Sequence, residues 1–301
     1  MTTSPNFLVI GECVADVVRA DGAPDRVHPG GSPANVAYGL ARLGRPATLL
    51  TQLADDAHGR LIRMHLEGAG VVVRAETVAR TPSAVVELDG DGRAQYAFDI
   101  GWTLGAAEVP DAPGYVHLGS IAAVTSPGAE TVLGIVERLR GRASVSYDPN
   151  VRPALMGERA VAVRRVERCV ALSHVVKASD EDLAWLYPGE APESVARHWL
   201  GLGPAVVVVT LGAAGAVALG ADGAREEVAA RPVRVADTVG AGDSFMAALL
   251  HARAAGTPLA VCLAHAVTAA AVTVSRPGAN PPSSAELAAA LGSGSLSRQP
   301  R

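Results

Sequence analysis

The chain has 301 residues, of which 49% are hydrophobic, and its formal net charge is −4. This length allows one large α/β domain, or a large domain with a small one, around a sizeable core. The charge lacks the basic footprint of nucleic-acid binders, and no apolar run is long enough to span a membrane, so we expect neither partner. Cys13, Cys169 and Cys262 lie far apart, without metal-ligand spacing, as is typical of reduced thiols in a cytoplasmic protein.

The first predicted strand is the short apolar run Phe7–Ile10, which Gly11 closes. Its uniform hydrophobicity is typical of a strand buried on both faces of a parallel sheet. Asp16 follows just past the carboxyl end of this strand, where open α/β sheets bind ligands. Position alone leaves two interpretations open for Asp16, a ligand-binding residue or an ordinary acid in a surface loop.

A double glycine, Gly30 and Gly31, precedes a predicted helix that begins near Pro33. Proline suits the first turn of a helix, and the two glycines allow a ligand to approach the backbone closely. Asn35 lies in that first turn and carries both a donor and an acceptor, which suits a neutral polyol. Taken alone, Asn35 could equally satisfy the local backbone.

Residues 71–104 change to short strands without helices. Two alternating runs flank the sequence DGDG at positions 89–92, and Asp-Gly between such runs indicates a hairpin. We therefore predict a small β lid built from about residues 12–30 and 71–104. Its residues Tyr96, Phe98, Asp99 and Trp102 would either line a ligand or pack lid against lid in a dimer.

Strands alternate with helices over most of the remaining chain. This alternation predicts an α/β fold with a doubly wound, mainly parallel sheet flanked by helices. Polar residues again follow the predicted strands. Arg152, in the sequence DPNVR, would hold a hydroxyl-rich or anionic ligand, or it is a surface cation near Asp148.

The segment KASDED at positions 177–182 follows another predicted strand. Ser179 with acidic residues after it forms a good helix start, and this structural interpretation alone would explain the segment. In a functional interpretation, Lys177 reaches phosphate groups and Asp182 orders water around Mg²⁺.

The sequence DTVGAGDSF at positions 237–245 lies between a β-branched run, Val233 and Val235, and a helical run. It predicts a strand, a glycine-rich turn and a helix start, which together form a socket for an anion such as phosphate. Asp243 in such a socket suits a general base that takes a proton from a hydroxyl group, although aspartate is also a favoured helix cap. The motif is neither a Walker A loop nor the dinucleotide fingerprint.

With both glycine motifs in this order, the chain resembles the ribokinase-like (PfkB-type) carbohydrate kinases over about residues 7–290. This resemblance implies a ribokinase-like kinase domain over residues 1–291, with a lid that often forms a homodimer. It also implies transfer of the γ-phosphoryl group of ATP to a primary hydroxyl of a sugar. Residues 292–301 are predicted to form a disordered tail.

The resemblance also implies roles for individual residues. Asp243 corresponds to the base, and the backbone N–H groups of Gly240, Ala241 and Gly242 to the anion hole. The remaining expected residues are Asp16, Gly31 and Asn35 for the sugar; Lys177, Ser179, Thr210, Gly212, Gly215 and Gly242 for the nucleotide; Asp182 for water around Mg²⁺; and Asp237 for a monovalent cation such as K⁺. From the patterns described above we add Gly30, Phe98 and Arg152 to the sugar site. The family's usual Asn-x-x-Glu is Ser179-x-x-Asp182 in this chain.

The sequence DPNVR resembles the pattern of fructokinases and 2-keto-3-deoxygluconate kinases more than that of ribokinases or adenosine kinases. A keto-acid substrate would require a second cation from the lid, but residues 96–102 contain no Arg or Lys, and Asp99 would repel a carboxylate. We therefore expect a neutral sugar, with fructose first and 2-keto-3-deoxygluconate or ribose as alternatives. A catalytically silent sugar- or nucleotide-binding regulator is the alternative from a different class, and the presence of Asp243 argues against it.

Overall fold

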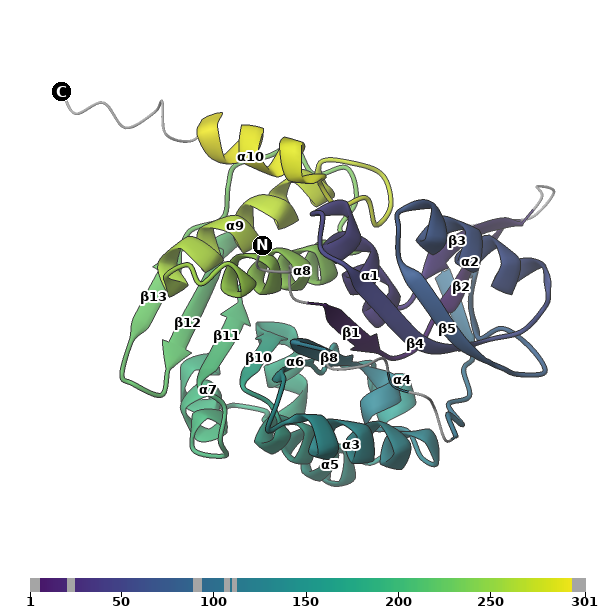
Figure 1. The fold of residues 1–301 in the computed structure, drawn as a ribbon, viewed down its shortest axis with the longest axis horizontal. Helices are drawn as coiled ribbons and strands as arrows, with labels where there is room; N and C mark the ends of the chain where they lie inside the picture. The colour runs from purple at the N-terminus through teal and green to yellow at the C-terminus, as the bar shows by residue number, and fades with distance from the viewer. Residues whose placement is uncertain (1–5, 21–24, 89–93, 106–108, 110–112, 294–301) are drawn as a thin grey trace.

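The computed structural model describes residues 6–20, 25–88, 94–105, 109 and 113–293 (Figure 1). Its centre is a nine-stranded sheet in the order β13-β12-β11-β10-β9-β8-β1-β4-β5. Neighbouring strands are parallel from β11 to β5, and β12 and β13 are antiparallel additions at one edge. The strands are β1 (Phe7–Ile10), β4 (Ala47–Leu53), β5 (Val72–Thr77), β8 (Tyr115–Gly119), β9 (Ser144–Asp148), β10 (Val175–Ser179), β11 (Val206–Thr210), β12 (Ala216–Gly220) and β13 (Arg225–Val228).

Helices cover both faces of this sheet, as the alternation of strands and helices predicts (Figure 1). One layer contains α1 (Ser32–Arg42), α2 (Ala57–Gly68), α8 (Ala241–Ala254), α9 (Leu259–Val274) and α10 (Ser284–Ser293). The opposite layer contains α3 (Gly128–Leu139), α5 (Arg159–Leu172), α6 (Asp180–Leu186) and α7 (Pro192–Leu200), with the short helix α4 (Pro153–Met156) nearby. Single 3₁₀ turns occupy Ile121–Ala123 and Gly212–Ala214.

Strand β1 shows why its sequence is uniformly apolar. Phe7 and Val9 pack into the core on the side of α1 and α8, whereas Leu8 and Ile10 pack into the core on the side of α3 and α5. Because successive side chains of a strand point to opposite faces, a strand between two helical layers must be apolar at every position.

A second, four-stranded sheet has the order β3-β2-β6-β7 and corresponds to the predicted lid. Its strands are β2 (Val14–Ala20), β3 (Arg26–Gly30), β6 (Ser83–Leu88) and β7 (Ala94–Asp99). Strands β6 and β7 are antiparallel neighbours, as expected for a hairpin, although positions 89–93 of the predicted turn lie outside the described residues. The small sheet is linked to the body through β2, which leaves the carboxyl end of β1.

The predicted lid boundary at residue 71 is wrong, because β5 belongs to the large sheet. Its residues from Val72 to Thr77 pair in parallel with β4. Helix α2 returns the chain to the sheet edge beside β4, so β4, α2 and β5 form a crossover unit with parallel strands. Trp102 is likewise not a lid residue, since its buried indole fits against Gly128 at the start of α3.

Two further expectations need correction near the carboxyl end of the chain. The run around Val233 and Val235 is not a strand: both side chains are exposed, and the following N–H groups of Ala236 and Asp237 donate to the carbonyl of Val274 in α9. The predicted tail begins too early, because α10 extends to Ser293. Positions 294–301 lie outside the described residues.

None of the helices in the described ranges is long and apolar enough to cross a membrane. The three cysteines are buried free thiols. Burial raises the pKa of Cys13 and Cys169 to about 12, so both are protonated at neutral pH.

Candidate active site

The candidate site lies where the strand order of the large sheet reverses, at β1. Strand β1 has β4 on one side and β8 on the other, and ligands of open α/β sheets bind outside the carboxyl ends of the strands at such a point. The chain leaves β1 into the small sheet and then returns to start α1. The N-termini of α1 and α8 thereby meet beside the ends of β8, β9 and β10.

Asp243 is the third residue of α8 and is only 8% exposed. Both of its carboxylate oxygens accept hydrogen bonds from α1. Ser32 Oγ donates to Oδ1 at 2.6 Å, and Asn35 Nδ2 donates to Oδ2 at 2.8 Å. The structure therefore brings together the two glycine motifs, which lie more than 200 positions apart in the sequence.

Gly31 allows α1 to start at this place. Its φ angle of 98° is in the region that favours glycine, and a Cβ atom there would lie 2.5 Å from the carbonyl oxygen of Glu12. Gly240 has the corresponding role before α8, with φ 75° and a Cβ position 2.6 Å from Ala279 Cβ. Both helix starts thus require glycine for conformational and steric reasons.

The loop from Gly240 to Gly242 presents the N-terminus of α8 to the site. The first N–H groups of a helix lack partners within the helix and carry partial positive charge. Ala241 N–H is partly engaged, since it donates to Thr238 O at 3.3 Å. A Cβ atom on Gly242 would lie 3.0 Å from Lys177 Nζ, so a side-chain cation lies directly beside this loop.

Lys177 extends from β10 and forms a buried ion pair. Its Nζ lies 2.7 Å from Asp148 Oδ2 at the end of β9. Burial alone would lower the pKa of Lys177, but the carboxylates of Asp148, Asp182 and Asp243 hold it above its usual value. Lys177 is consequently charged at neutral pH, next to the loop expected to bind an anion.

Asp16 lies on β2 in a row that crosses the small sheet. It is opposite His28 on one side and Ala84 on the other, and Ala84 is opposite Phe98. Residues in such a row share one face of the sheet. A Cβ atom on Gly30 would lie 2.1 Å from Asp16 Oδ2, so the glycine leaves room for this carboxylate.

The surroundings of Asp16 change its proton affinity. Burial raises the pKa of Asp16 to about 6, while the charges of His28 and Arg152 oppose this shift. Arg152 is held by Asn150, whose Oδ1 accepts from its guanidinium at 2.9 Å. Phe98 lies in the same row and is 36% exposed.

The residues expected for the nucleotide lie at the ends of two neighbouring strands. Ser179 of β10 is paired with Thr210 of β11. The turn after β11 contains Gly212 with φ 53° and Gly215 with φ 104°, and Leu211 N–H donates to Gly215 O. A Cβ atom on Gly215 would lie 2.1 Å from Val228 O, so this turn also requires glycine.

Asp182 has a structural use that the sequence pattern had left open. It forms a capping box with Ser179, accepting from Ser179 N–H at 2.9 Å through Oδ2. Its other oxygen, Oδ1, accepts from Val151 N–H at 2.7 Å. Asp182 thereby links the start of α6 to the segment that carries Arg152.

Asp237 connects the loop from Gly240 to Gly242, called the anion loop below, to the turn after α9. It accepts from Val239 N–H at 3.0 Å and from Gly278 N–H at 2.9 Å. These two hydrogen bonds lower the pKa of Asp237, so it carries a negative charge at neutral pH.

Three residues of the site were missed from sequence. Ser32 contacts Asp243, His28 is opposite Asp16, and Glu12 accepts hydrogen bonds from Ser120 Oγ and Ala122 N–H. Burial raises the pKa of Glu12. The only sequence signal for Ser32 is its position beside Gly31, that for Glu12 is its position after Gly11, and His28 gave no signal.

Cations near the small sheet were also underestimated. The prediction considered only residues 96–102, but the guanidinium of Arg80 lies 4.0 Å from Asp99, and His28 comes from β3. The argument against an acidic substrate from the absence of lid cations is therefore weaker than it appeared from the sequence.

Mg²⁺ usually binds through one or two carboxylates together with substrate phosphates. Within the described ranges, no group of three or more His, Cys, Asp or Glu side chains is arranged to hold a metal ion. Asp148 pairs with Lys177, Asp182 contributes to the raised pKa of Lys177, and both oxygens of Asp182 already accept backbone N–H groups. These residues fit a magnesium ion that the nucleotide carries, rather than a resident metal centre.

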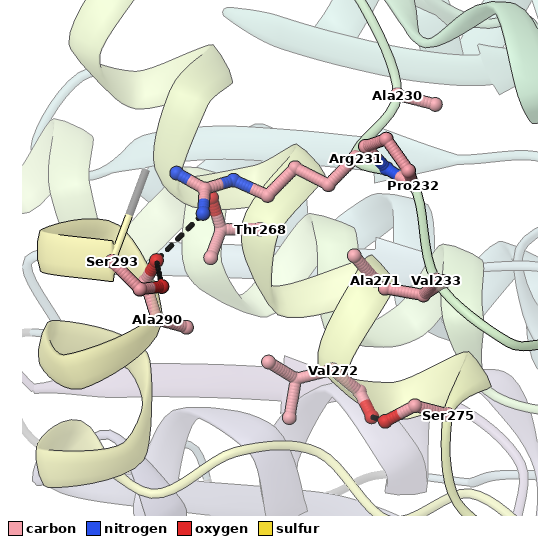
Figure 2. Close-up of a pocket in the computed structure, with 10 residues that line it drawn as sticks. All are labelled: Ala230, Arg231, Pro232, Val233, Thr268, Ala271, Val272, Ser275, Ala290 and Ser293. Atoms are coloured by element: carbon pink, nitrogen blue, oxygen red, sulfur yellow. Dashed lines mark hydrogen bonds between the residues drawn. The ribbon is translucent and has the colours of Figure 1, made fainter. Parts of the chain in front are cut away.

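A separate cavity of about 470 Å³ lies between the segment after β13, α9 and α10 (Figure 2). Arg231 reaches across it, and its Nη1 donates to Ala290 O at 2.6 Å. Its lining is mostly small and apolar and contains none of the site residues predicted from sequence. The cavity therefore stands apart from the chemistry around Asp243.

Comparison with known proteins agrees with this geometry. The profile of the pfkB family of carbohydrate kinases matches residues 4–286. The chain is 34% identical to a fructokinase of Rhizobium leguminosarum bv. trifolii over 259 residues, covering 81% of this chain and 78% of that protein. It is also 34% identical to a fructokinase of Klebsiella pneumoniae over 289 residues, covering 90% and 94%.

A solved structure shows the same fold. The fructokinase of Vibrio cholerae O395, as a double mutant in its fructose-, ADP- and potassium-bound form, superposes with a TM-score of 0.82 at 25% identity, covering 96% of this chain and 98% of that one. The two glycine motifs, the doubly wound sheet and the full-length match lead to one conclusion: the chain belongs to the pfkB family of carbohydrate kinases.

Proposed function

We propose that this sugar kinase phosphorylates fructose in preference to other sugars, with Asp243 as the general base. The observation that carries this proposal is the position of Asp243, a buried carboxylate at the N-terminus of α8 that also contacts Asn35 of α1. A base, a polar side chain for binding the sugar and an anion-binding loop thus meet in one place. Similarity to fructokinases supports fructose as the substrate.

The reaction requires mainly positioning and charge stabilisation. Asp243 accepts the proton of the sugar's primary hydroxyl, while the oxygen of that hydroxyl forms a bond to the γ-phosphorus of ATP. The bond from that phosphorus to the bridging oxygen breaks, and its electrons leave with ADP. The N–H groups at Gly240, Ala241 and Gly242 and the ammonium of Lys177 stabilise the phosphoryl charge.

Other residues hold the two substrates. Asp16, Asn35 and the backbone at Gly30 and Gly31 bind the sugar hydroxyls, and Arg152 and Phe98 border that site. Ser179, Thr210, Gly212 and Gly215 face the nucleotide. Mg²⁺, when bound with the nucleotide, neutralises phosphate charge, and Asp182 would contact it through water. Asp237 would hold a monovalent cation such as K⁺ beside the anion loop.

The test is an ADP-release assay with Mg-ATP and a panel of fructose, ribose, 2-keto-3-deoxygluconate and adenosine. We expect the highest kcat/KM for fructose, because Asp16 at neutral pH repels an anionic sugar. A preference for the keto acid would mean that Arg152, with His28 or Arg80, handles its carboxylate. A lack of turnover on every sugar, with ATP still bound, would favour the silent regulator.

We also propose that the enzyme is a cytoplasmic homodimer that pairs through the small sheet. Support comes from the partly exposed Phe98 on the sheet face that carries Asp16, and from the buried free thiols. Light scattering coupled to gel filtration measures the mass directly. A monomer, or a dimer that survives Phe98→Glu unchanged, would contradict pairing through this face.

A further inference from the structure

The hydrogen bond from Ser32 to Asp243 is shorter than the one from Asn35, and Ser32 has no role in the expected chemistry. Its Oγ donates to Asp243 Oδ1 at 2.6 Å, between two side chains that are both buried. Hydrogen bonds from a hydroxyl to a carboxylate at this length are strong, because the acceptor is charged. Ser32 is therefore tightly coupled to the expected base.

The hydroxyl of Ser32 is not used to start its own helix. Serine at a helix start usually caps the backbone, but here Gly31 is the N-cap and no side chain caps α1. Ser32 is the first residue inside α1, and its hydroxyl crosses to α8 instead. The local rule for serine thus gives way to a contact with a residue 211 positions away.

Packing between α1 and α8 does not depend on this polar contact. Gly39 of α1 lets Ala247 of α8 approach so closely that a Cβ atom on Gly39 would lie 2.8 Å from Ala247 Cβ. Val36, Leu40 and Leu249 bury their side chains in the same core cluster. An apolar interface therefore joins the two helices, which weakens a purely structural explanation of the Ser32 contact.

We propose that Ser32 is a positioning residue for Asp243, an inference that rests on the proposed function. Asn35 binds the sugar in the proposed function, so Ser32 is the donor that keeps its hydrogen bond to Asp243 during the reaction. With Oδ1 held by Ser32, Oδ2 faces the substrate hydroxyl. The substrate proton moves to Oδ2, while Ser32 keeps its own proton throughout.

The experiment compares Ser32→Ala with Ser244→Ala. Ser244 is also buried and is adjacent to Asp243, but its Oγ pairs at 2.8 Å with Thr273 Oγ1, whose hydroxyl lies 2.8 Å from Ala269 O. We expect Ser32→Ala to lower kcat about tenfold through loss of orientation. In the pH profile of kcat/KM, the acidic limb of Ser32→Ala should move to higher pH by about one unit, because a donor that favours the charged carboxylate is lost. Ser244→Ala should keep both the rate and the pH profile.

Ser32→Thr retains a hydroxyl and should restore the pH limb to its wild-type position. If Ser32→Ala leaves the pH limb unmoved, or if Ser244→Ala moves it equally, the positioning role is wrong. Equal melting temperatures of the two alanine variants would show that folding does not cause the difference.

A second readout separates this inference from the choice of substrate. Carboxyl ¹³C chemical shifts of labelled aspartate follow the protonation of Asp243 without any sugar, with Asp243→Asn supplying the assignment. The titration of Asp243 should move upward in Ser32→Ala even if fructose is not the substrate. An unmoved titration overturns the inference, whereas a failure of fructose alone overturns only the proposed substrate.

Discussion

The ammonium of Lys177 and the carboxylate of Asp148 lie 2.7 Å apart, with 4% and 0% of their side chains exposed. Two charges with so little solvent around them depend on each other, because a buried charge without its partner is costly. The pair also places a cation beside Gly242, so it has both a structural and a catalytic consequence. These two consequences can be separated by mutation.

Lys177→Met should destabilise the protein by about 3–5 kcal/mol, because it leaves Asp148 buried without its partner. The double variant Lys177→Met with Asp148→Asn should regain most of that stability in urea unfolding, since the unpaired charge is gone. Activity should remain low in both variants, because the cation beside the anion loop is absent. Recovery of activity together with stability would assign Lys177 a structural role only.

Asp243→Asn should lower kcat by about 10²–10⁴-fold, the usual contribution of a general base, while KM for the sugar changes much less. The substitution preserves shape and still offers one oxygen to Ser32 or Asn35. Steady-state kinetics and a thermal melt of the same preparation measure the two effects. Near-wild-type turnover in the folded variant would mean that Asp243 is not the base.

Gly242→Ala and Gly240→Ala form a matched pair in the anion loop. Alanine at 242 lies inside the helix, where it is a good helix former, but its Cβ would lie 3.0 Å from Lys177 Nζ. We expect this variant to lose at least about tenfold in kcat while its melting temperature stays close to that of the wild type.

Gly240→Ala should reduce both stability and activity. Its φ angle of 75° disfavours alanine, and the new Cβ would overlap Ala279. Differential scanning calorimetry of both variants tests the contrast. If Gly242→Ala proves to be the less stable of the two, the described geometry of this loop is incorrect.

The raised pKa of Asp16 predicts that the stability of the protein depends on pH. Burial raises its pKa from 3.8 to about 6, so between these values the folded protein holds a proton that the unfolded chain has released. The contribution of Asp16 to the free energy of unfolding is therefore fully present below pH 3.8 and is lost as the pH rises through about 6.

Asp16→Asn should consequently melt at a higher temperature than the wild type at pH 7, and the difference should vanish towards pH 4. Its KM for the sugar should rise about tenfold, because hydrogen bonds to a charged group are lost. Asp55→Asn, at an exposed ion pair with Arg60, is the control and should show no such gain. A wild type that is more stable than Asp16→Asn at pH 7 would contradict the buried setting of Asp16.

The sequence clearly indicated the arrangement of the large sheet and its helical layers. Uniform apolar runs such as Phe7–Ile10 are typical of strands between two helical layers, and their alternation with helices predicted the doubly wound sheet. Local propensity failed for β-branched residues without a strand partner, as at Val233 and Val235, and for β5, whose pairing depends on where α2 returns the chain.

By itself, the sequence determined the two glycine-dependent helix starts and the acid that follows one of them, because positive φ angles and close backbone contacts admit almost no other residue. Only the tertiary structure decided that Ser32 contacts Asp243, that His28 lies opposite Asp16, and that Asp182 accepts from Val151 N–H. Such contacts join segments far apart in the chain. Their partners are chosen by sheet order and helix packing, which no local pattern of residues records.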